Sequence, residues 1–413
     1  MRNVVLLAVT VLAWAASAAC QAQKLELGGQ VRVQWTEQDA ARSGPLAQAN
    51  AVQPGTVATP DSGATLESEL RASGHGVTAV ATLQQSRWRD RTADGKSWIN
   101  ELYAAHDGGA WQFSAGKKIV AWDVGYGFRP NDMVQQEERL GLVTSTAQGR
   151  PVLMAEHFTA DTAWSLVALH PTASPQDLGV LEPALAARVY QRNGALDSYG
   201  FARLGARNGA SVGAAVAWVA NDALELHGSL RYLSRVDSKA INPTTNGLVS
   251  SNPWRASAVE DVAQALVGGT WTHESQLSLL AEAWWDGTAM SDTQWDAWGQ
   301  RNTQLANLAN HGPPASAVAG NLAWQSDAFG VSPSLRRSNV LLRISWQSGP
   351  WTPTLDVLYT PADQGRVVTA ALSWQGDRVQ VQGGVRTFGG PDNAVAAQLA
   401  ARSVAYITTN WTF

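Results

Sequence analysis

The sequence ends in a run in which apolar and polar side chains alternate, Ala405-Tyr406-Ile407-Thr408-Thr409-Asn410-Trp411-Thr412-Phe413. Successive side chains of a strand point to opposite faces, so Ile407, Trp411 and Phe413 share one face, and Tyr406, Thr408 and Asn410 share the other. The segment therefore predicts a β-strand with one apolar and one polar face.

The same period of two recurs along the chain. It is clear in residues 25–35, 224–235, 340–346 and 379–386. About eighteen such strands can be placed between residue 24 and the end, and the number would be sixteen if the hairpin from Tyr199 to Val219 is misread. Alternation also occurs in soluble sandwiches, so it does not decide the architecture alone.

The connections separate the two architectures. Tight turns such as Asn193-Gly194 and Gly376-Asp377 alternate with long connections over residues 36–63, 121–151, 236–261 and 286–337. Short turns at one end and long loops at the other are typical of bacterial outer-membrane barrels. The final strand also resembles that of outer-membrane proteins, in which a terminal aromatic residue is read by the barrel-assembly machinery. We expect an all-β fold, a single transmembrane antiparallel up-and-down barrel.

Composition agrees with a barrel and excludes other classes. Mean hydropathy is −0.16 and charged residues make up 15% of 413 residues, which excludes a bundle of membrane helices. Lys and Arg number 30 against 34 Asp and Glu, so there is no basic excess for nucleic acid. We expect no cofactor and no metal.

The N-terminus predicts a secretory signal peptide over residues 1–22, followed by the barrel over 23–413. Arg2 is followed by an apolar run and then by small residues near Ala22. Cys20 is the single cysteine, which excludes a disulfide within the chain; it is removed with the signal or, as the alternative, carries a lipid.

Tryptophans recur at the ends of the expected strands, on the apolar face. Aromatic side chains in this position form girdles at the lipid interface, in contact with outer-membrane lipid and lipopolysaccharide. The expected anchors are Trp35, Trp271, Trp346, Trp374, Trp411 and Phe413.

The opposite face of the strands would line the lumen and carries both signs of charge. These side chains either solvate one another or form a constriction that selects solutes by charge, and arginine suits carboxylate or phosphate groups. The predicted lumen residues are Arg32, Arg71, Arg188, Arg203, Arg231, Arg235, Arg343, Arg378, Arg386, Glu67, Glu69, Glu101 and Glu282.

Two long connections have features of ordered loops. Residues 119–151 mix glycines, aromatics and charges, and by position they resemble the third external loop of general porins, which folds into the channel. Asp123, Arg129 and Asp132 would then face the pore, followed by Glu137, Glu138 and Arg139; the alternative is a rim loop without effect on permeation. Residues 286–337 predict a helix capped at Ser291 or Asp292 with Trp295, Trp298, Leu305 and Leu308 on one face.

The whole plan resembles the alginate-export type of outer-membrane channel and, more loosely, sugar-specific porins. The resemblance rests on the signal peptide, the strand number, the arginines and residues 116–132. It implies passage of a hydrophilic solute and no particular binding residue. Comparable acidic and basic counts are a departure that argues against an anionic polymer.

Two other classes stay open. An outer-membrane enzyme would need a nucleophile and a base. The best candidate base is His227 beside Glu225, and no catalytic motif accompanies them. A barrel that houses a partner protein is the second alternative.

Overall fold

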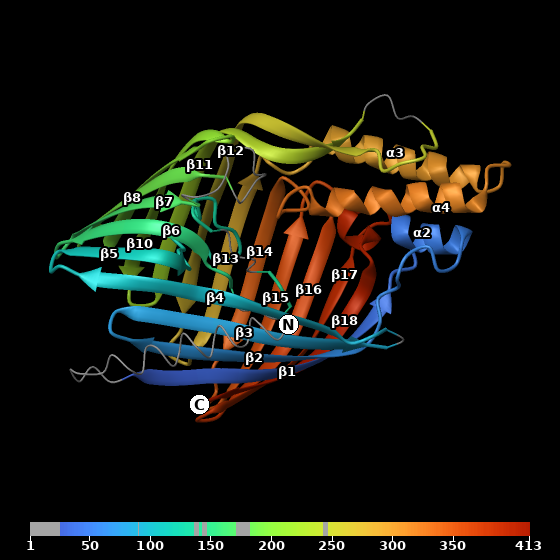
Figure 1. Ribbon diagram of the computed structural model, residues 1–413. Coiled ribbons are helices and arrows are strands. Elements are labelled where there is room, and N and C mark those ends of the chain that lie inside the picture. Colours follow the sequence, from blue (N-terminus) through green and yellow to red (C-terminus); the bar gives the residue numbers. More distant parts are fainter. Residues whose placement is uncertain (1–24, 90, 136–139, 143–146, 171–181, 243–246) are drawn as a thin grey trace, which may run out of the picture.

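The computed structural model describes residues 25–89, 91–135, 140–142, 147–170, 182–242 and 247–413. The expected signal peptide and Cys20 lie outside these residues. The strands form one antiparallel sheet of 18, in which each strand pairs with the next and β1 pairs with β18 (Figure 1). The prediction of an eighteen-stranded up-and-down barrel is confirmed, and the alternative of sixteen is wrong.

The first half of the wall extends from β1 to β9. Its strands are β1 Glu26–Ala40, β2 Gly63–Gly74, β3 Val77–Trp88, β4 Asp94–Asp107, β5 Trp111–Lys118, β6 Arg150–Phe158, β7 Thr162–Leu169, β8 Ala184–Asn193 and β9 Leu196–Gly205. The second half consists of β10 Gly209–Asn221, β11 Leu224–Ile241, β12 Trp254–Thr272, β13 Leu277–Asp286, β14 Ser338–Trp346, β15 Trp351–Thr360, β16 Gly365–Gln375, β17 Val379–Gly389 and β18 Ala401–Thr412.

The last strand closes the barrel. β18 pairs with β1 in antiparallel register, from Gln30 opposite Thr412 to Ala40 opposite Ala401. Beyond these pairs, the amide N–H of Phe413 donates to the carbonyl oxygen of Gly29 at 3.0 Å. Ile407 and Phe413 are each 48% exposed on the outside, whereas Tyr406 is buried on the inside. Closure leaves none of the eighteen described strands with a free edge, because each of them has two neighbours.

The outer surface is apolar over the height of the wall. Leu27, Leu204 and Val267 are exposed by 69, 60 and 64%, and other large apolar side chains share their parity. Exposed apolar area on this scale is stable in lipid and not in water. Among the described residues, no helix is long and apolar enough to cross a membrane.

The predicted anchors all have outward parity, at two different heights. Trp271, Trp346, Trp374, Trp411 and Phe413 lie near the hairpin turns, at what we call the turn end. Trp35 is 44% exposed near the opposite end, the loop end. β1 was expected to end at Trp35, but it continues to Ala40.

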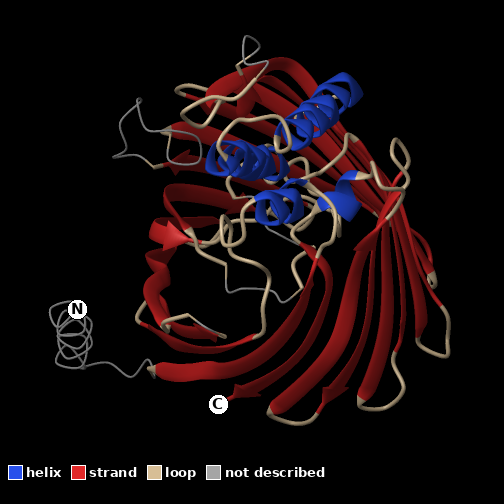
Figure 2. Ribbon diagram, turned by 90° about the vertical axis from the view of Figure 1, so that its right-hand side faces the viewer, coloured by secondary structure: helices blue, strands red, loops and turns tan. Residues whose placement is uncertain are grey.

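Helices gather at the loop end. We call α2 (Pro45–Val52), α3 (Asp292–Leu308), α4 (Ala315–Trp324) and the 3-10 helix η2 (Gln325–Gly330) the helical cap; it lies over part of the mouth, beside η3 (Val395–Gln398) (Figures 1 and 2). α3 begins as predicted, because the Ser291 hydroxyl accepts from the Gln294 N–H and the Gln294 side chain accepts from the Ser291 N–H.

Candidate functional site

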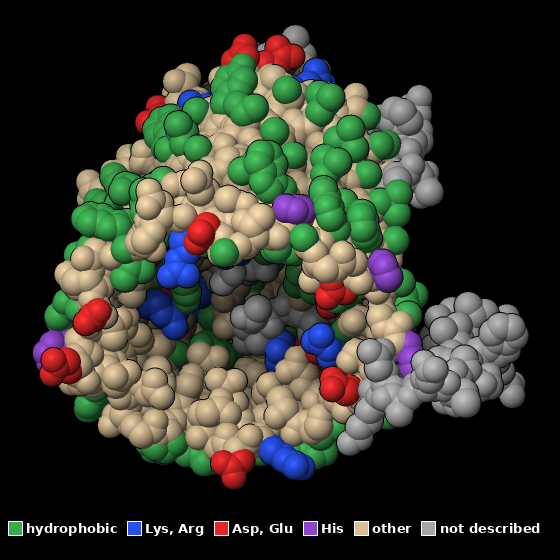
Figure 3. All heavy atoms as spheres, turned by 90° about the vertical axis from the view of Figure 1, so that its left-hand side faces the viewer, with side chains coloured by type: hydrophobic (Ala, Val, Ile, Leu, Met, Phe, Trp, Pro, Cys, Tyr) green, Lys and Arg blue, Asp and Glu red, His purple; other side chains and the backbone are tan. Residues whose placement is uncertain are grey.

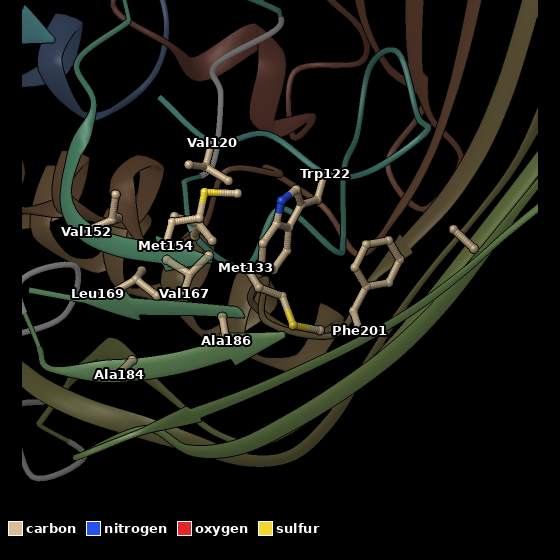
Figure 4. Packing of buried hydrophobic residues seen from close by; sticks show 12 residues of the cluster. Val120, Trp122, Met133, Val152, Met154, Val167, Leu169, Ala184, Ala186 and Phe201 are labelled. Atoms are coloured by element: carbon tan, nitrogen blue, oxygen red, sulfur yellow. The ribbon is translucent and has the colours of Figure 1, made fainter. Parts of the chain in front are cut away.

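The connection between β5 and β6, residues 119–149, is here called the inner loop. Its described part lies against the inner wall of the barrel. Trp122 stacks on Phe201 of β9 with ring centroids 6.4 Å apart, and Met133 joins the same buried cluster (Figure 4). Further along, Phe128 stacks on Trp284 of β13 at 5.7 Å. Each such buried side chain contributes about 1.5–3 kcal/mol, so apolar packing alone holds the loop strongly.

Glu282 of β13 holds the tip of the loop. Its carboxylate accepts from the N–H groups of Tyr126 and Gly127 at 2.6 and 2.7 Å. The same carboxylate lies 2.9 Å from Nε2 of His227, whose Nδ1 contacts Glu225 at 3.1 Å. His227 is 6% exposed and both of its ring nitrogens have a carboxylate partner. It is a structural residue here, since a general base needs an accessible nitrogen.

The two loop carboxylates face protein and not the open lumen. Asp132 Oδ1 accepts from the N–H groups of Trp122 and Asp123 at 2.9 and 3.1 Å. Asp123 accepts from the N–H of Asn131 at 2.6 Å and from the Ser229 hydroxyl of β11 at 2.8 Å. Both aspartates are 5% exposed. The expectation that they face the pore is wrong, because the loop uses them to bind its own backbone and the wall.

Burial raises the pKa of both Asp123 and Asp132 above the ordinary value of 3.8, although hydrogen bonds and Arg129 partly oppose the rise. A raised pKa means that the folded protein binds more protons than the unfolded chain between the ordinary and the raised value. Folding stability therefore increases as the pH falls through that window and decreases as the pH rises through it.

The variant Asp132→Asn copies the protonated carboxyl, because Oδ1 keeps both N–H donors. We expect it to raise the unfolding midpoint relative to the natural chain at pH 7, with a difference that shrinks as the pH falls towards about 4. Thermal unfolding of detergent-solubilised protein between pH 4 and 8 measures this difference. Asp222→Asn, in an exposed turn, is the control; a difference that grows towards low pH would contradict the assignment.

The other half of the lumen is a cavity of about 950 Å³ between the inner loop, η2 and the wall of β1 and β13 to β18. Its loop-end face is closed in part by the helical cap, and at the turn end the barrel opens into a hollow with basic and acidic side chains around it (Figure 3). Six arginines and one carboxylate, Asp356, line the described part of the cavity: Arg32, Arg129, Arg336, Arg343, Arg366 and Arg386. Arg366 is on the outward parity of β16, so five guanidinium groups face inward.

Most of these arginines have a carboxylate partner. Arg32 pairs with Glu67 at 3.3 Å, Arg129 with Asp132 at 3.6 Å and Arg343 with Asp356 at 3.1 Å. Arg336 pairs with two carboxylates, those of Asp292 and Asp363. The guanidinium of Arg386 donates to the Thr369 hydroxyl at 2.8 Å and the Leu140 carbonyl at 2.7 Å, and the described residues place no carboxylate within 4.0 Å of it.

The remaining predicted lumen residues lie elsewhere. Arg188, Arg203 and Arg231 face the half of the lumen that the inner loop occupies; Arg231 donates to the Pro130 carbonyl and Arg203 to Glu182. Glu101 accepts from the N–H of Ile119, where the loop begins. Glu69 faces inward outside the cavity, and Glu137, Glu138 and Arg139 lie outside the described residues.

Three predicted residues are not part of a constriction. Arg71 is exposed near the turn end and Arg378 is exposed in the turn between β16 and β17. Arg235 forms an exposed pair with Glu260 where β11 has passed its last partner in β10 and pairs with β12 alone. The alternation of side chains predicted which face of the strand each residue lies on, but it could not predict how far along the barrel axis, between turn end and loop end, the residue lies.

Sequence reasoning missed Arg336 and Tyr126. Arg336 precedes β14, and Tyr126 is in the inner loop, where its hydroxyl accepts from Arg343 at 2.5 Å. Neither residue belongs to a strand, so no periodicity could assign it to the lumen. Among the described residues there is no group of three or more His, Cys, Asp and Glu side chains that could hold a metal ion.

No family model matches the sequence, and no curated protein matches it. Solved structures do match. OpdL of Pseudomonas aeruginosa has 9% sequence identity and a TM-score of 0.54 over 94% of this chain and 99% of its own. OpdK of the same organism, solved with vanillate, has 8% identity and a TM-score of 0.54 over 94 and 98%. A mutant porin of Rhodopseudomonas blastica covers 94 and 100% at 11% identity, with a TM-score of 0.43. These likenesses show the fold alone, a closed β-barrel like that of OpdL and OpdK.

Proposed function

We propose that this protein is a passive channel of a Gram-negative outer membrane for small hydrophilic solutes, with a preference for anions. The observation that carries the proposal is the cavity beside the inner loop, where five inward-facing guanidinium groups meet one carboxylate. Fixed charges in a narrow wet passage with low-dielectric walls set the local ion concentration.

Several features support a membrane channel. The outer surface is apolar, the lumen is polar, and the inner loop narrows the passage without occupying the cavity. On this proposal the turn end faces the periplasm and the loop end faces the exterior, lipid and lipopolysaccharide surround the wall, and Phe413 is read by the barrel-assembly machinery. From the resemblance to alginate-export-type channels the proposal takes solute passage alone.

The carboxylates that pair with the arginines reduce the field and do not abolish it. Arg32, Arg129 and Arg343 each have one carboxylate partner and Arg336 has two, so Arg386 is the inward-facing guanidinium that has no carboxylate within 4.0 Å among the described residues. The preference is therefore expected to be moderate and to weaken in high salt, where the screening length falls from roughly 10 Å at 0.1 M to 3 Å at 1 M.

Refolded protein in a planar bilayer tests the proposal. In a tenfold gradient of potassium chloride we expect stable open steps and a reversal potential with the sign of chloride selectivity. A reversal potential with the sign of potassium would overturn the anion preference. Folded barrels that insert and show no steps would overturn the channel itself.

A further inference from the structure

The strand register arranges the cavity wall in two rows, one pleat apart. The row nearer the loop end is apolar: Leu341 pairs with Leu358, Leu358 with Val367, and Val367 with Phe388. Leu341 is covered by Phe128, whereas the other three side chains are partly exposed to the cavity. The wall therefore offers an apolar surface that is open to the cavity.

The row nearer the turn end is polar. Arg343 pairs with Asp356, Asp356 with Thr369, and Thr369 with Arg386 across the same four strands. Residues two apart on a strand are separated by about 6.5 Å, so each polar side chain lies that far from an apolar one. The Arg343 and Asp356 charges cancel, which leaves one net positive charge in this row, on Arg386.

Arg386 makes two hydrogen bonds to the protein, and these leave other N–H donors of its guanidinium group available to a solute. One bond to Thr369 uses Nε and one to the Leu140 carbonyl uses Nη1, so the Nη2 group makes no hydrogen bond to the described residues. A guanidinium has five N–H donors. A carboxylate is the group that such a fork binds best, through two parallel hydrogen bonds.

We propose that these two rows form a binding site for a small monoanion with an apolar body, such as an aromatic or branched-chain carboxylate. The carboxylate binds Arg386, and the body lies over Leu358, Val367 and Phe388, towards the loop end. The proposal rests on the proposed channel function, since solutes reach the site only through the lumen. One net charge in the row fits a monoanion better than a dianion or a polymer.

Benzoate, acetate and benzyl alcohol are the probes, because benzoate has both groups and the others have one each. We expect benzoate to block the chloride current at concentrations at least about tenfold lower than acetate, and benzyl alcohol not to block. Arg386→Gln is expected to weaken the benzoate block at least about tenfold. Phe388→Ala is expected to weaken the benzoate block and leave the acetate block unchanged.

Arg71→Gln is the matched control, because it removes the same charge from an inward position outside the cavity. Equal weakening by Arg71→Gln and Arg386→Gln would overturn the site and leave only a diffuse field. Equal block by acetate and benzoate would overturn the apolar row. If the folded barrel does not conduct, the channel proposal fails, and calorimetric titration of benzoate into the protein still tests the site: binding lost in Arg386→Gln supports it, and no binding overturns it.

Discussion

Excision of residues 124–130, with two glycines in their place, is expected to raise the single-channel conductance severalfold. These residues form the tip of the inner loop, which borders the cavity through Tyr126, Gly127, Phe128 and Arg129. The two ends of the tip already meet, since the Asn131 N–H donates to the Asp123 carboxylate at 2.6 Å. The shortened loop can therefore close without moving the residues that anchor it.

The rest of the loop has its own anchors. Trp122 and Met133 stay in the apolar cluster against Phe201, and Asp132 keeps the two N–H groups that it binds. Removal of the tip thus takes away seven residues of bulk and one guanidinium; of the side chains that pack against that cluster it removes the partly buried Val124 and keeps Trp122 and Met133. Anion preference should fall together with the rise in conductance, because Arg129 is lost.

Planar-bilayer recording measures both quantities, and resistance of the folded barrel to unfolding in detergent shows that the wall is intact. Tyr126→Phe is the control, because it keeps the tip and removes only the hydroxyl that Arg343 contacts. An unchanged conductance in the folded, shortened barrel would show that the tip does not border the narrowest part of the passage.

Strand parity predicted the wall well because lipid imposes it. In β18 the large side chains of the outer face are apolar because they meet lipid, and the structure places Ile407 and Phe413 outside and Tyr406 inside, as expected. The same signal fails where a strand leaves the lipid. β11 continues beyond its expected end to Ile241, and β12 begins at Trp254, before its expected start. Here Ile241 and Trp254 pack on the cluster of Trp295 and not on lipid, so the alternation that lipid imposes is not needed.

Trp35 shows the same limit. An interfacial tryptophan marks the edge of the lipid and not the end of a strand, so β1 was predicted five residues too short. α2 and α4 were missed for another reason. They have 8 and 10 residues, too short for a clear helical period, and short helices of this kind depend on tertiary packing.

The candidate site was harder to predict than the wall. Periodicity identified Arg32, Arg343 and Arg386 as inward-facing, but it could not separate them from Arg71, which faces inward at the turn end. The loop residues have no parity, so Asp123 and Asp132 were assigned to the pore when they bind backbone N–H groups. The position of a residue along the barrel axis and the path of a loop both depend on contacts between segments far apart in sequence. The alternation within one strand therefore cannot predict them.

The helical cap has its own core, which makes its stability separable from that of the wall. Ala49 of α2, Leu305 of α3 and Val318 and Leu322 of α4 are at most 1% exposed and pack together. Two buried amides support the same core: Asn321 bonds to the backbone of Val249, and Gln325 bonds to Asn302. The wall strands are held by a closed ladder of pairs that does not depend on these contacts.

Leu322→Asp is therefore expected to unfold the helical cap and leave the barrel folded. A carboxylate at this fully buried position would have no charged partner in the cluster and would cost several kcal/mol, in addition to the lost packing of the leucine side chain. Limited proteolysis should then cut within residues 286–337 at least about tenfold faster, since each 1.4 kcal/mol changes the open population tenfold. The cut chain should still insert and conduct.

Ser316→Asp is the matched control, because it adds the same charge to an exposed position in the first turn of α4, where a helix N-terminus tolerates it. This variant should be cut as slowly as the natural chain. Equal cutting of both variants would show that charge alone loosens the cap, and loss of the folded barrel in Leu322→Asp would show that cap and wall unfold as one unit. Rapid cutting of Leu322→Asp alone, with conductance retained, would mean that the wall forms the channel and the cap only restricts access to its mouth.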